Sequence, residues 1–290
     1  MFKTLIVALD LGDDGDHALS AVEVLASTAP VTVELVTVSY PGTPTDADSW
    51  ELERRAARFA GSGATWNVIV DTDVAHALLR HVAERPEALL VMGTSARRPL
   101  NAALFGSVVQ DVLRNTDRPV LLVGPHVEAG GEPCTSLIAC VDASDSATWA
   151  VPAIVSWQET FGSRTLRVAE VLPVDARNAA AARHHVDTVT SLLAAQRVEA
   201  VAIVVRHDDP VTGLEHLADE LTGAIYVAAS GRYTDGRPHL HSTTQELVRR
   251  ATRPVLIVPA RPSLPMAATV DGVERCVHQS FHNTIVSPSA

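Results

Sequence analysis

Short aliphatic runs alternate along this chain with segments in which apolar residues recur at helical spacing. The first run ends at Asp10, and the segment that follows carries Ala18, Val22 and Leu25 three or four positions apart. This alternation is typical of βαβ units, in which helices cover a parallel sheet. Asp73 is expected to cap the third helix. The first half should contain strands over 5–9, 31–39, 66–70, 88–92 and 119–123, with helices over 16–27, 49–60, 74–84 and 108–115.

The same pattern restarts after residue 135. The run 137–142 again ends in an aspartate, Asp142, which lies 132 positions after Asp10. The segment 253–258 repeats 118–123, 135 positions later. A self-similarity this long predicts two copies of one domain. The second copy should contain helices over 147–160, 179–196 and 214–221 and strands over 165–172, 200–205 and 224–228.

The repeat divides the 290 residues into four parts. The first domain spans 1–125, a polar linker spans 126–135, and the second domain spans 136–262. We expect the two domains to pack about an approximate two-fold axis as an internal pseudo-dimer. The tail, 263–290, matches nothing in the first half; it either docks on the body or on a partner, or has no fixed structure.

Composition narrows the compartment and the classes of partner. A net charge of −11 disfavours non-specific binding to nucleic acid or to anionic membranes. The three cysteines form no CxxC pair, which suits a reducing cytosol. No apolar run approaches the length of a membrane span. We therefore expect a cytoplasmic protein without a nucleic-acid or membrane partner.

Small residues gather after the fourth strand of the first domain. Gly93 and Ala96 follow that strand, and the pair Gly106-Ser107 opens the next helix. Backbone that carries no bulky side chains beside a helix N-terminus presents N–H groups to an anion. Without a ligand, the same residues would form a tight turn with Ser107 as an N-cap.

Two further features favour a phosphate site over a simple turn. Asp10 ends the first strand at the edge where open α/β sheets bind ligands. Arg97 and Arg98 lie in the loop between Ala96 and Gly106, and supply positive charge in an otherwise acidic protein.

With these residues the sequence resembles the universal stress protein family, and specifically its tandem-domain members. The family's ATP-binding signature is Gly, two residues, Gly, nine residues, Gly and then Ser or Thr. Gly93, Gly106 and Ser107 match it, and Ala96 is the one departure. The resemblance covers the chain nearly to Pro262, once per half. It implies two tandem doubly wound α/β domains, each with a five-stranded parallel sheet of the Rossmann-like, adenine nucleotide α hydrolase-like type.

The resemblance also implies a function and a set of site residues. The chain would be a stress-response or signalling protein that binds ATP, accompanied by Mg²⁺. Members of the family commonly dimerise, so a homodimer is expected as well as the internal pseudo-dimer. Asp10 would lie near the ribose and the backbone of Val38 near the adenine, while Ser107 and the amide of Val108 would donate to phosphate oxygens. Ala96 would cost about 1 kcal/mol if that position needs a positive φ. The expected cofactor-binding residues are Asp10, Val38, Met92, Gly93, Ala96, Arg97, Gly106, Ser107 and Val108.

The corresponding site of the second domain departs further from the signature. An imidazole at the start of its last helix would obstruct a phosphate, so we expect this domain to bind ATP weakly or not at all. A single shift of 135 positions aligns Gly93, Ala96, Gly106 and Ser107 with Ala228, Gly231, His241 and Ser242.

The groups of histidines elsewhere in the sequence predict no metal site. His239 and His241 beside Asp235 lack a third ligand of suitable spacing, so no metal site is expected. The helical pairs, His76 with His81 and His184 with His185, do not share a helix face and are expected to be solvated.

No Ser-His-Asp order, HExxH or GxxxxGK[ST] motif occurs, so no catalytic residue is assigned and slow ATP hydrolysis is the most turnover expected. Two alternatives remain open. One is an interaction protein that binds no nucleotide and dimerises through the strand edges at 120–123 and 255–258. The other is a nucleotidyl-transferring enzyme, which the missing catalytic histidine and lysine motifs disfavour.

Overall fold

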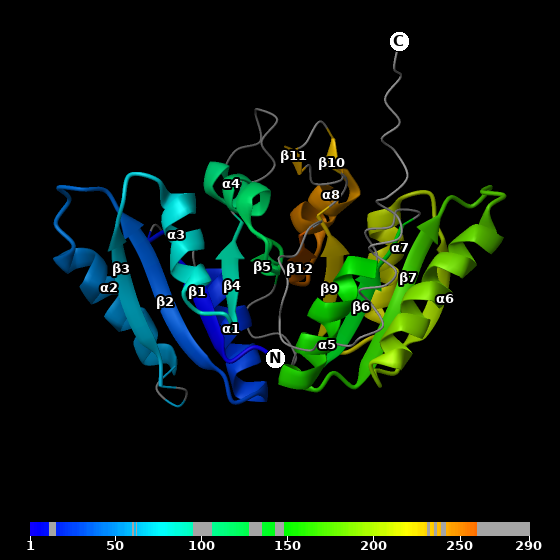
Figure 1. Cartoon of the computed structure of the whole chain (residues 1–290), viewed down its shortest axis with the longest axis horizontal. Helices are drawn as coiled ribbons and strands as arrows, with labels where there is room; N and C mark the ends of the chain where they lie inside the picture. Colours follow the sequence, from blue (N-terminus) through cyan, green and yellow to red (C-terminus); the bar gives the residue numbers. More distant parts are fainter. Residues whose placement is uncertain are drawn as a thin grey trace, which may run out of the picture.

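The computed structural model describes residues 1–11, 16–59, 61, 63–94, 106–127, 135–142, 148–230, 233–234, 237–238 and 242–259. Its strands form one ten-stranded sheet in the order β3-β2-β1-β4-β5-β12-β9-β6-β7-β8 (Figure 1). The first half contains β1 (Thr4–Ala8), α1 (Asp16–Thr28), β2 (Thr32–Ser39), α2 (Asp46–Ala56), the 3-10 turn η1 (Ala57–Phe59), β3 (Thr65–Val70), α3 (Val74–Ala83), β4 (Ala88–Gly93), α4 (Ser107–Asn115) and β5 (Val120–Val123).

The second half repeats this order. It contains β6 (Ser136–Cys140), α5 (Ala150–Phe161), β7 (Thr165–Leu172), α6 (Ala179–Ala195), β8 (Val201–Arg206), α7 (Pro210–Asp219), β9 (Ala224–Ala229), the two-residue strands β10 (Tyr233–Thr234) and β11 (Arg237–Pro238), α8 (Ser242–Arg250) and β12 (Val255–Val258). Within each half the strands of the main sheet are parallel. The expected α/β architecture, with two units of five strands, is therefore confirmed.

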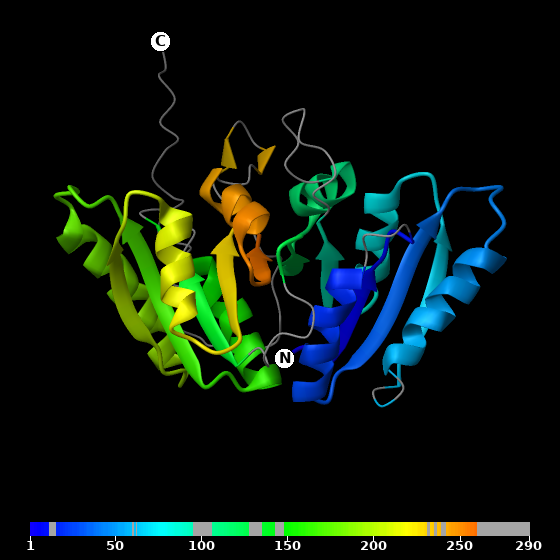
Figure 2. The same cartoon turned by 180° about the vertical axis from the view of Figure 1, so that it is seen from behind.

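Helices cover both faces of the sheet in each half (Figures 1 and 2). In the first half, Leu19 of α1 and Leu52 of α2 are buried in one apolar cluster, whereas Leu78 of α3 and Val112 of α4 are buried in the cluster on the other face. In the second half, α5 and α6 belong to the first cluster and α7 and α8 to the second. Strands covered on both faces are continuous aliphatic runs, which explains why the sequence pattern predicted them.

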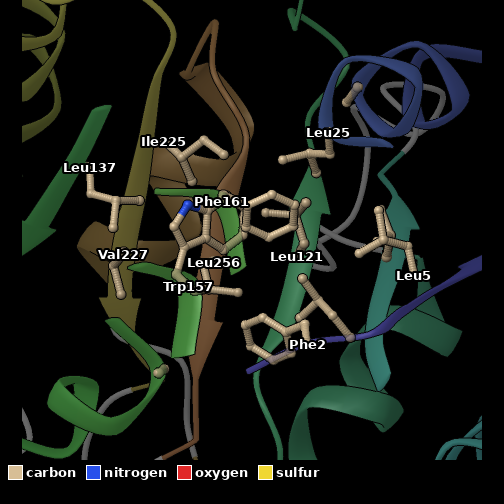
Figure 3. Close-up of a cluster of buried hydrophobic side chains, with 14 of the residues drawn as sticks. Phe2, Leu5, Leu25, Leu121, Leu137, Trp157, Phe161, Ile225, Val227 and Leu256 are labelled. Carbon is tan, nitrogen blue, oxygen red and sulfur yellow. The ribbon is translucent and has the colours of Figure 1, made fainter. Parts of the chain in front are cut away.

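The two halves join through their last strands. β12 pairs with β5 in the antiparallel direction, with Leu256 opposite Leu121. Beside this junction the rings of Trp157 and Phe161 have centroids 4.4 Å apart and lie between side chains of the two halves (Figure 3). The backbone N–H of Phe2 also crosses the junction and donates to Thr160 Oγ1 over 2.7 Å. The strand edges at 120–123 and 255–258, through which one alternative had the protein dimerise, are therefore paired with each other inside one chain.

Two local expectations can be compared with the structure. Asp73 caps α3 as predicted, because its side chain accepts from the N–H of His76 over 2.9 Å. The prediction that α7 begins at residue 214 is wrong, because the helix begins at Pro210. Asp209 caps that helix by accepting from the N–H of Thr212, and proline fits the first turn, where its missing N–H is not needed.

The expectation that the helical histidines are solvated is wrong for His81. This side chain is buried, and its Nε2 lies 3.0 Å from Oε1 of the buried Glu34 on β2. Arg85 completes the cluster, with its Nε 3.1 Å from Glu34 Oε2. His185 is only partly exposed and lies 2.9 Å from Glu170. In both cases a carboxylate on a neighbouring strand supplies the partner that makes burial of the imidazole tolerable.

Candidate functional site

The predicted site residues of the first domain converge on the carboxyl ends of β1, β2 and β4. Ala8, the last residue of β1, pairs with both Val36 and Met92, so the three strands end side by side. Asp10 lies two residues beyond β1, and Gly93 is the last residue of β4. This edge is where open parallel sheets bind ligands.

The three residues Met92, Val38 and Asp10 differ in what they present to the edge. Met92 is buried in the apolar cluster with α3 and α4, so its side chain belongs to the core. Val38 is partly buried against the same cluster. Asp10, by contrast, is exposed and takes part in a polar interaction, as befits a residue beyond the strand end.

Gly93 is tightly packed, and its neighbour was not among the residues expected from the sequence. A Cβ on Gly93 would lie 3.0 Å from Nε2 of His17, in the first turn of α1. That nitrogen is buried and has no hydrogen-bond partner among the described residues. A buried polar atom without a partner is rare and needs an explanation such as a ligand. His17 is therefore a site candidate; its only signal in the sequence was its place at the start of the first helix.

The N-terminus of α4 is open. Gly106 is the N-cap and makes no side-chain capping bond, and a Cβ placed on it would meet nothing within 4 Å in the described structure. Ser107 is the first helical residue and not the N-cap, so that detail of the expectation is wrong by one position. Gly106 and Ser107 are exposed and Val108 is partly buried. Figure 1 shows α4 above the ends of β4 and β5.

Several expected residues lie outside the described part of the chain. They include Ala96, Arg97 and Arg98, which follow β4, so their contribution to the site stays a prediction. The same holds for Gly231, for the histidines at 239 and 241 with Asp235, and for the tail 263–290. Within the described ranges, no three His, Cys, Asp or Glu side chains are grouped as a metal site would require.

The strand registers correct the comparison of the two halves. Met92 pairs with Ala8 of β1, and Ala228 pairs with Cys140 of β6, so Met92 and Ala228 are equivalent. Gly93 therefore corresponds to Ala229 and not to Ala228. The single shift of 135 positions holds for β5 and β12 but fails for β4 and β9, which are 136 positions apart, because the connections differ in length.

The residue that occupies the position of His17 also differs between the halves. The buried positions of α1 and α5 match at a shift of 132, with Ala18 and Val22 equivalent to Ala150 and Ile154. His17 then corresponds to Trp149. The second domain thus has an alanine, Ala229, at the place of Gly93 and a tryptophan, Trp149, at the place of His17.

Comparison with known proteins agrees with this architecture. A family model described as the universal stress protein family matches residues 1–124 and 136–259. No curated protein sequence matches the chain. None of the described helices is long and apolar enough to cross a membrane.

Solved structures with the same two-domain arrangement are similar over nearly the whole chain. A universal stress protein from Archaeoglobus fulgidus is 16% identical, covers 89% of this chain and 98% of its own, and has a TM-score of 0.63. A Pseudomonas aeruginosa protein described as functionally unknown is 15% identical, covers 89% and 92%, and has a TM-score of 0.59. The cytoplasmic domain of a prokaryotic cation chloride cotransporter is 14% identical, covers 90% and 96%, and has a TM-score of 0.55. At these identities the likeness concerns the fold alone.

Proposed function

Because this chain belongs to the universal stress protein family, we propose that it is an ATP-binding regulatory protein that takes one nucleotide per chain in its first domain. The observation that carries the proposal is the pairing of two features at one sheet edge. The strand β4 ends at Gly93 against a buried imidazole nitrogen that has no hydrogen-bond partner within the described ranges, and the helix α4 begins with an exposed N-terminus that no described side chain caps.

These features fit a triphosphate. The first N–H groups of a helix lack partners within the helix, and they carry the positive end of the helix dipole. At α4 they are those of Ser107 and Val108, preceded by a glycine that adds no side chain in front of them. The Ser107 hydroxyl adds a further donor. His17 Nε2 would gain a partner from a phosphate oxygen, which would remove the cost of its burial.

The nucleoside part would lie over the ends of β1 and β2. Asp10 would accept from ribose hydroxyls, because an exposed carboxylate is an acceptor for both. The backbone at Val38 would face the base at the end of β2. ATP would contribute negative charge and Mg²⁺-binding oxygens to the site, and the chain's own residues would contribute donors and an apolar floor.

This site supports a regulatory role better than it supports rapid hydrolysis of ATP. No general base is assigned near the expected phosphates, so slow hydrolysis is the most turnover proposed. Binding at the edge of β1, β2 and β4 would bias the conformation of the segments that follow these strands, and through them the choice of partner in a stress response. Dimerisation through β5 or β12 is not favoured, because these strands pair with each other.

Calorimetric titration of Mg-ATP into the full chain tests the proposal. The expected result is micromolar binding at one site per chain. Gly106→Gln should abolish it, because a long side chain would stand in front of the α4 N-terminus. His241→Gln, at the position that the sequence of the second domain aligns with Gly106, is the matched control and should bind as the unaltered protein does.

Three outcomes would contradict the proposal. The first is the absence of heat together with no nucleotide released from the denatured protein. The second is retention of full affinity in Gly106→Gln. The third is two equal sites per chain, which would return the second domain to consideration as a nucleotide site.

A further inference from the structure

The ten-stranded sheet ends in an edge strand on each side, β3 in the first half and β8 in the second. Figure 1 shows β3 and its covering helix α2 at one end of the molecule. Exposed large apolar side chains gather at this end, on β3, on α2 and just after β2; they are Tyr40, Trp50, Trp66 and Val70. Two of the chain's four tryptophans are thus exposed here, and tryptophan is enriched in protein interfaces relative to other surfaces.

The backbone of β3 alternates between groups that face β2 and groups that face away from it. The N–H of Asp71, the residue after β3, donates to the carbonyl of Ser39 over 3.1 Å, so residue 71 faces β2. Because the alternation along a strand has a period of two, the N–H and C=O groups of Trp66, Val68 and Val70 point outward. No described strand lies on that side of β3. Such a row of outward backbone groups is a template for a further strand.

The side chains of the same three residues lie on one face of the sheet. Val68 packs against the apolar cluster that contains Leu52 of α2, so Trp66 and Val70, two positions away on either side, also lie on the α2 face. Trp66 is 42% exposed and Val70 is 51% exposed. If two β3 strands pair in the antiparallel direction with Val68 opposite itself, Trp66 of each copy stands opposite Val70 of the other. Each of these pairs then exchanges both of its N–H···O bonds.

The charges on α2 favour this antiparallel arrangement. The first turn of α2 carries Asp46 and Asp48, and its last turn carries Arg54 and Arg55. A two-fold axis perpendicular to the sheet places α2 of the two copies antiparallel on one face, with the acidic start of one beside the basic end of the other. The strand itself, 65–70, carries no charged residue, so no like charges oppose each other across the pair.

The equivalent edge of the second half carries a charge. The strand registers align Val70 with Arg206 of β8 and Trp66 with Ala202. The Arg206 guanidinium donates to the carbonyl of Pro173 over 3.0 Å, which holds the charge at the end of β8. Charged side chains on edge strands oppose edge-to-edge pairing. The β3 edge therefore has apolar side chains at the positions where the β8 edge has a guanidinium and a methyl group.

We propose that β3 binds the β3 strand of a second copy of this chain, in the antiparallel register that places Val68 on the two-fold axis. The same surface is used by both copies, so the contact closes on itself and yields a dimer. The strands β5 and β12 take no part, because they pair with each other. This proposal does not depend on nucleotide binding in the first domain.

Light scattering during size-exclusion chromatography of the full chain tests the association. The particle should contain two chains and should dissociate on dilution. Val70→Arg gives β3 the residue of β8 and should weaken dimerisation about tenfold or more, because a charge would stand opposite Trp66 of the second copy. Val201→Arg, the same change at an exposed valine of β8, is the matched control and should leave the dimer intact. Thermal unfolding checks that both variants fold.

Cysteine cross-linking tests the register. In Val68→Cys the two sulfurs would face each other across the axis, with Cα atoms about 5.5 Å apart, which a disulfide can span. Oxidised glutathione should therefore trap a covalent dimer. Val70→Cys is the control and should not cross-link, because residue 70 faces Trp66 and lies two positions from the axis. The unaltered chain, with its three cysteines, gives the background.

The proposal is overturned if the chain is a monomer at every concentration, which would leave the β3 edge to another segment or a different partner. It is overturned if folded Val70→Arg dimerises as the unaltered chain does, or if Val70→Cys cross-links as readily as Val68→Cys. Equal losses in Val70→Arg and Val201→Arg would also overturn it, because they would indicate pairing of β3 with β8 of another copy, a contact that forms open chains.

Discussion

The imidazole of His17 lies against the backbone of Gly93, so closely that a Cβ at residue 93 would come within 3.0 Å of His17 Nε2. This contact joins the first turn of α1 to the end of β4. It explains why glycine stands at the first position of the proposed phosphate-binding segment: the position is restricted by packing, and its φ is not in the left-handed region. The same contact places an imidazole at the edge where phosphate is expected.

Gly93→Ala is therefore expected to displace His17 and to lower both stability and Mg-ATP affinity. Overpacking at one methyl group costs about 1 kcal/mol, and the affinity should fall about tenfold if the displacement costs the bound state a further 1.4 kcal/mol. Urea unfolding and calorimetry measure the two effects. Gly61→Ala is the control, because a Cβ there meets nothing within 4 Å and φ is not positive.

A double-mutant cycle separates packing from ligand contact. His17→Ala removes the ring, so the stability cost of Gly93→Ala should largely disappear in the double variant, with a coupling of more than about 0.5 kcal/mol. If His17 also contacts the nucleotide, His17→Ala alone will weaken Mg-ATP binding. Additive stability effects would show that the two residues do not meet in solution.

The order of elements and the repeat could be predicted from the sequence because strands buried on both faces are unbroken aliphatic runs. The strand expected over 165–172 coincides with β7. The pairing of β5 with β12 was harder to predict, because a strand at an open edge and one at a covered junction have the same composition. The burial of His81 on α3 depends on its contact with Glu34 on β2, which the local periodicity of the helix does not report.

The candidate site was predicted in part for similar reasons. The ends of β1, β2 and β4 follow from the parallel sheet, so Asp10, Val38 and Gly93 were expected at one edge. His17 was missed because its role depends on a contact with Gly93 that only the packing of α1 reveals. The correspondence between the two halves was predicted only in part, because a single shift aligned Ala228 with Gly93, whereas the register aligns it with Met92.

The hydrogen bond from the Phe2 N–H to Thr160 Oγ1 should contribute measurably to the junction of the halves. Thr160→Val keeps the shape and leaves the N–H of the buried Phe2 without its acceptor. Leaving a buried donor unpaired costs about 1–3 kcal/mol, which urea unfolding would measure. Thr188→Val is the matched control: this hydroxyl donates to the carbonyl of His184 on the exposed side of α6, and its loss should change stability by less than about 0.5 kcal/mol.

The ion pairs that link the second strand of each half to its third helix have opposite polarity, and they should differ in strength. Ile6 pairs with Glu34, which contacts His81 and Arg85, whereas the equivalent Ile138 pairs with Arg167, which contacts Glu220 over 2.7 Å. The Glu34 side chain is 11% exposed and that of Glu220 is 65% exposed.

Glu34→Gln should therefore destabilise the protein by about 3 kcal/mol, because it breaks a buried pair. Glu220→Gln should cost less than about 1 kcal/mol, since solvent screens an exposed pair. Urea unfolding of the two variants makes the comparison within one protein. Equal losses would show that burial does not set the strength of these pairs.

The pair formed by Asp209 and Arg250 predicts a specific dependence of stability on pH. A hydrogen bond from the Arg250 guanidinium, followed by one from the N–H of Thr212, lowers the pKa of Asp209 from 3.8 to about 2. Since the pKa is depressed in the folded state, the stabilisation is complete above the unfolded pKa near 4 and is lost as the pH falls toward 2. The Asp209 side chain is 43% exposed, so screening limits the effect to about 1 kcal/mol or less.

Asp209→Asn isolates this contribution, because asparagine can still cap α7 but does not ionise. The variant should be less stable than the unaltered chain at pH 7, and the difference should shrink as the pH falls from about 4 toward 2. Urea unfolding at a series of pH values measures the difference directly. Asp187→Asn, in the exposed pair of Asp187 with Arg183 on α6, is the control and should show a smaller difference at pH 7. A difference for Asp209→Asn that stays constant from pH 7 to pH 3 would show that the loss comes from the cap and not from the charge.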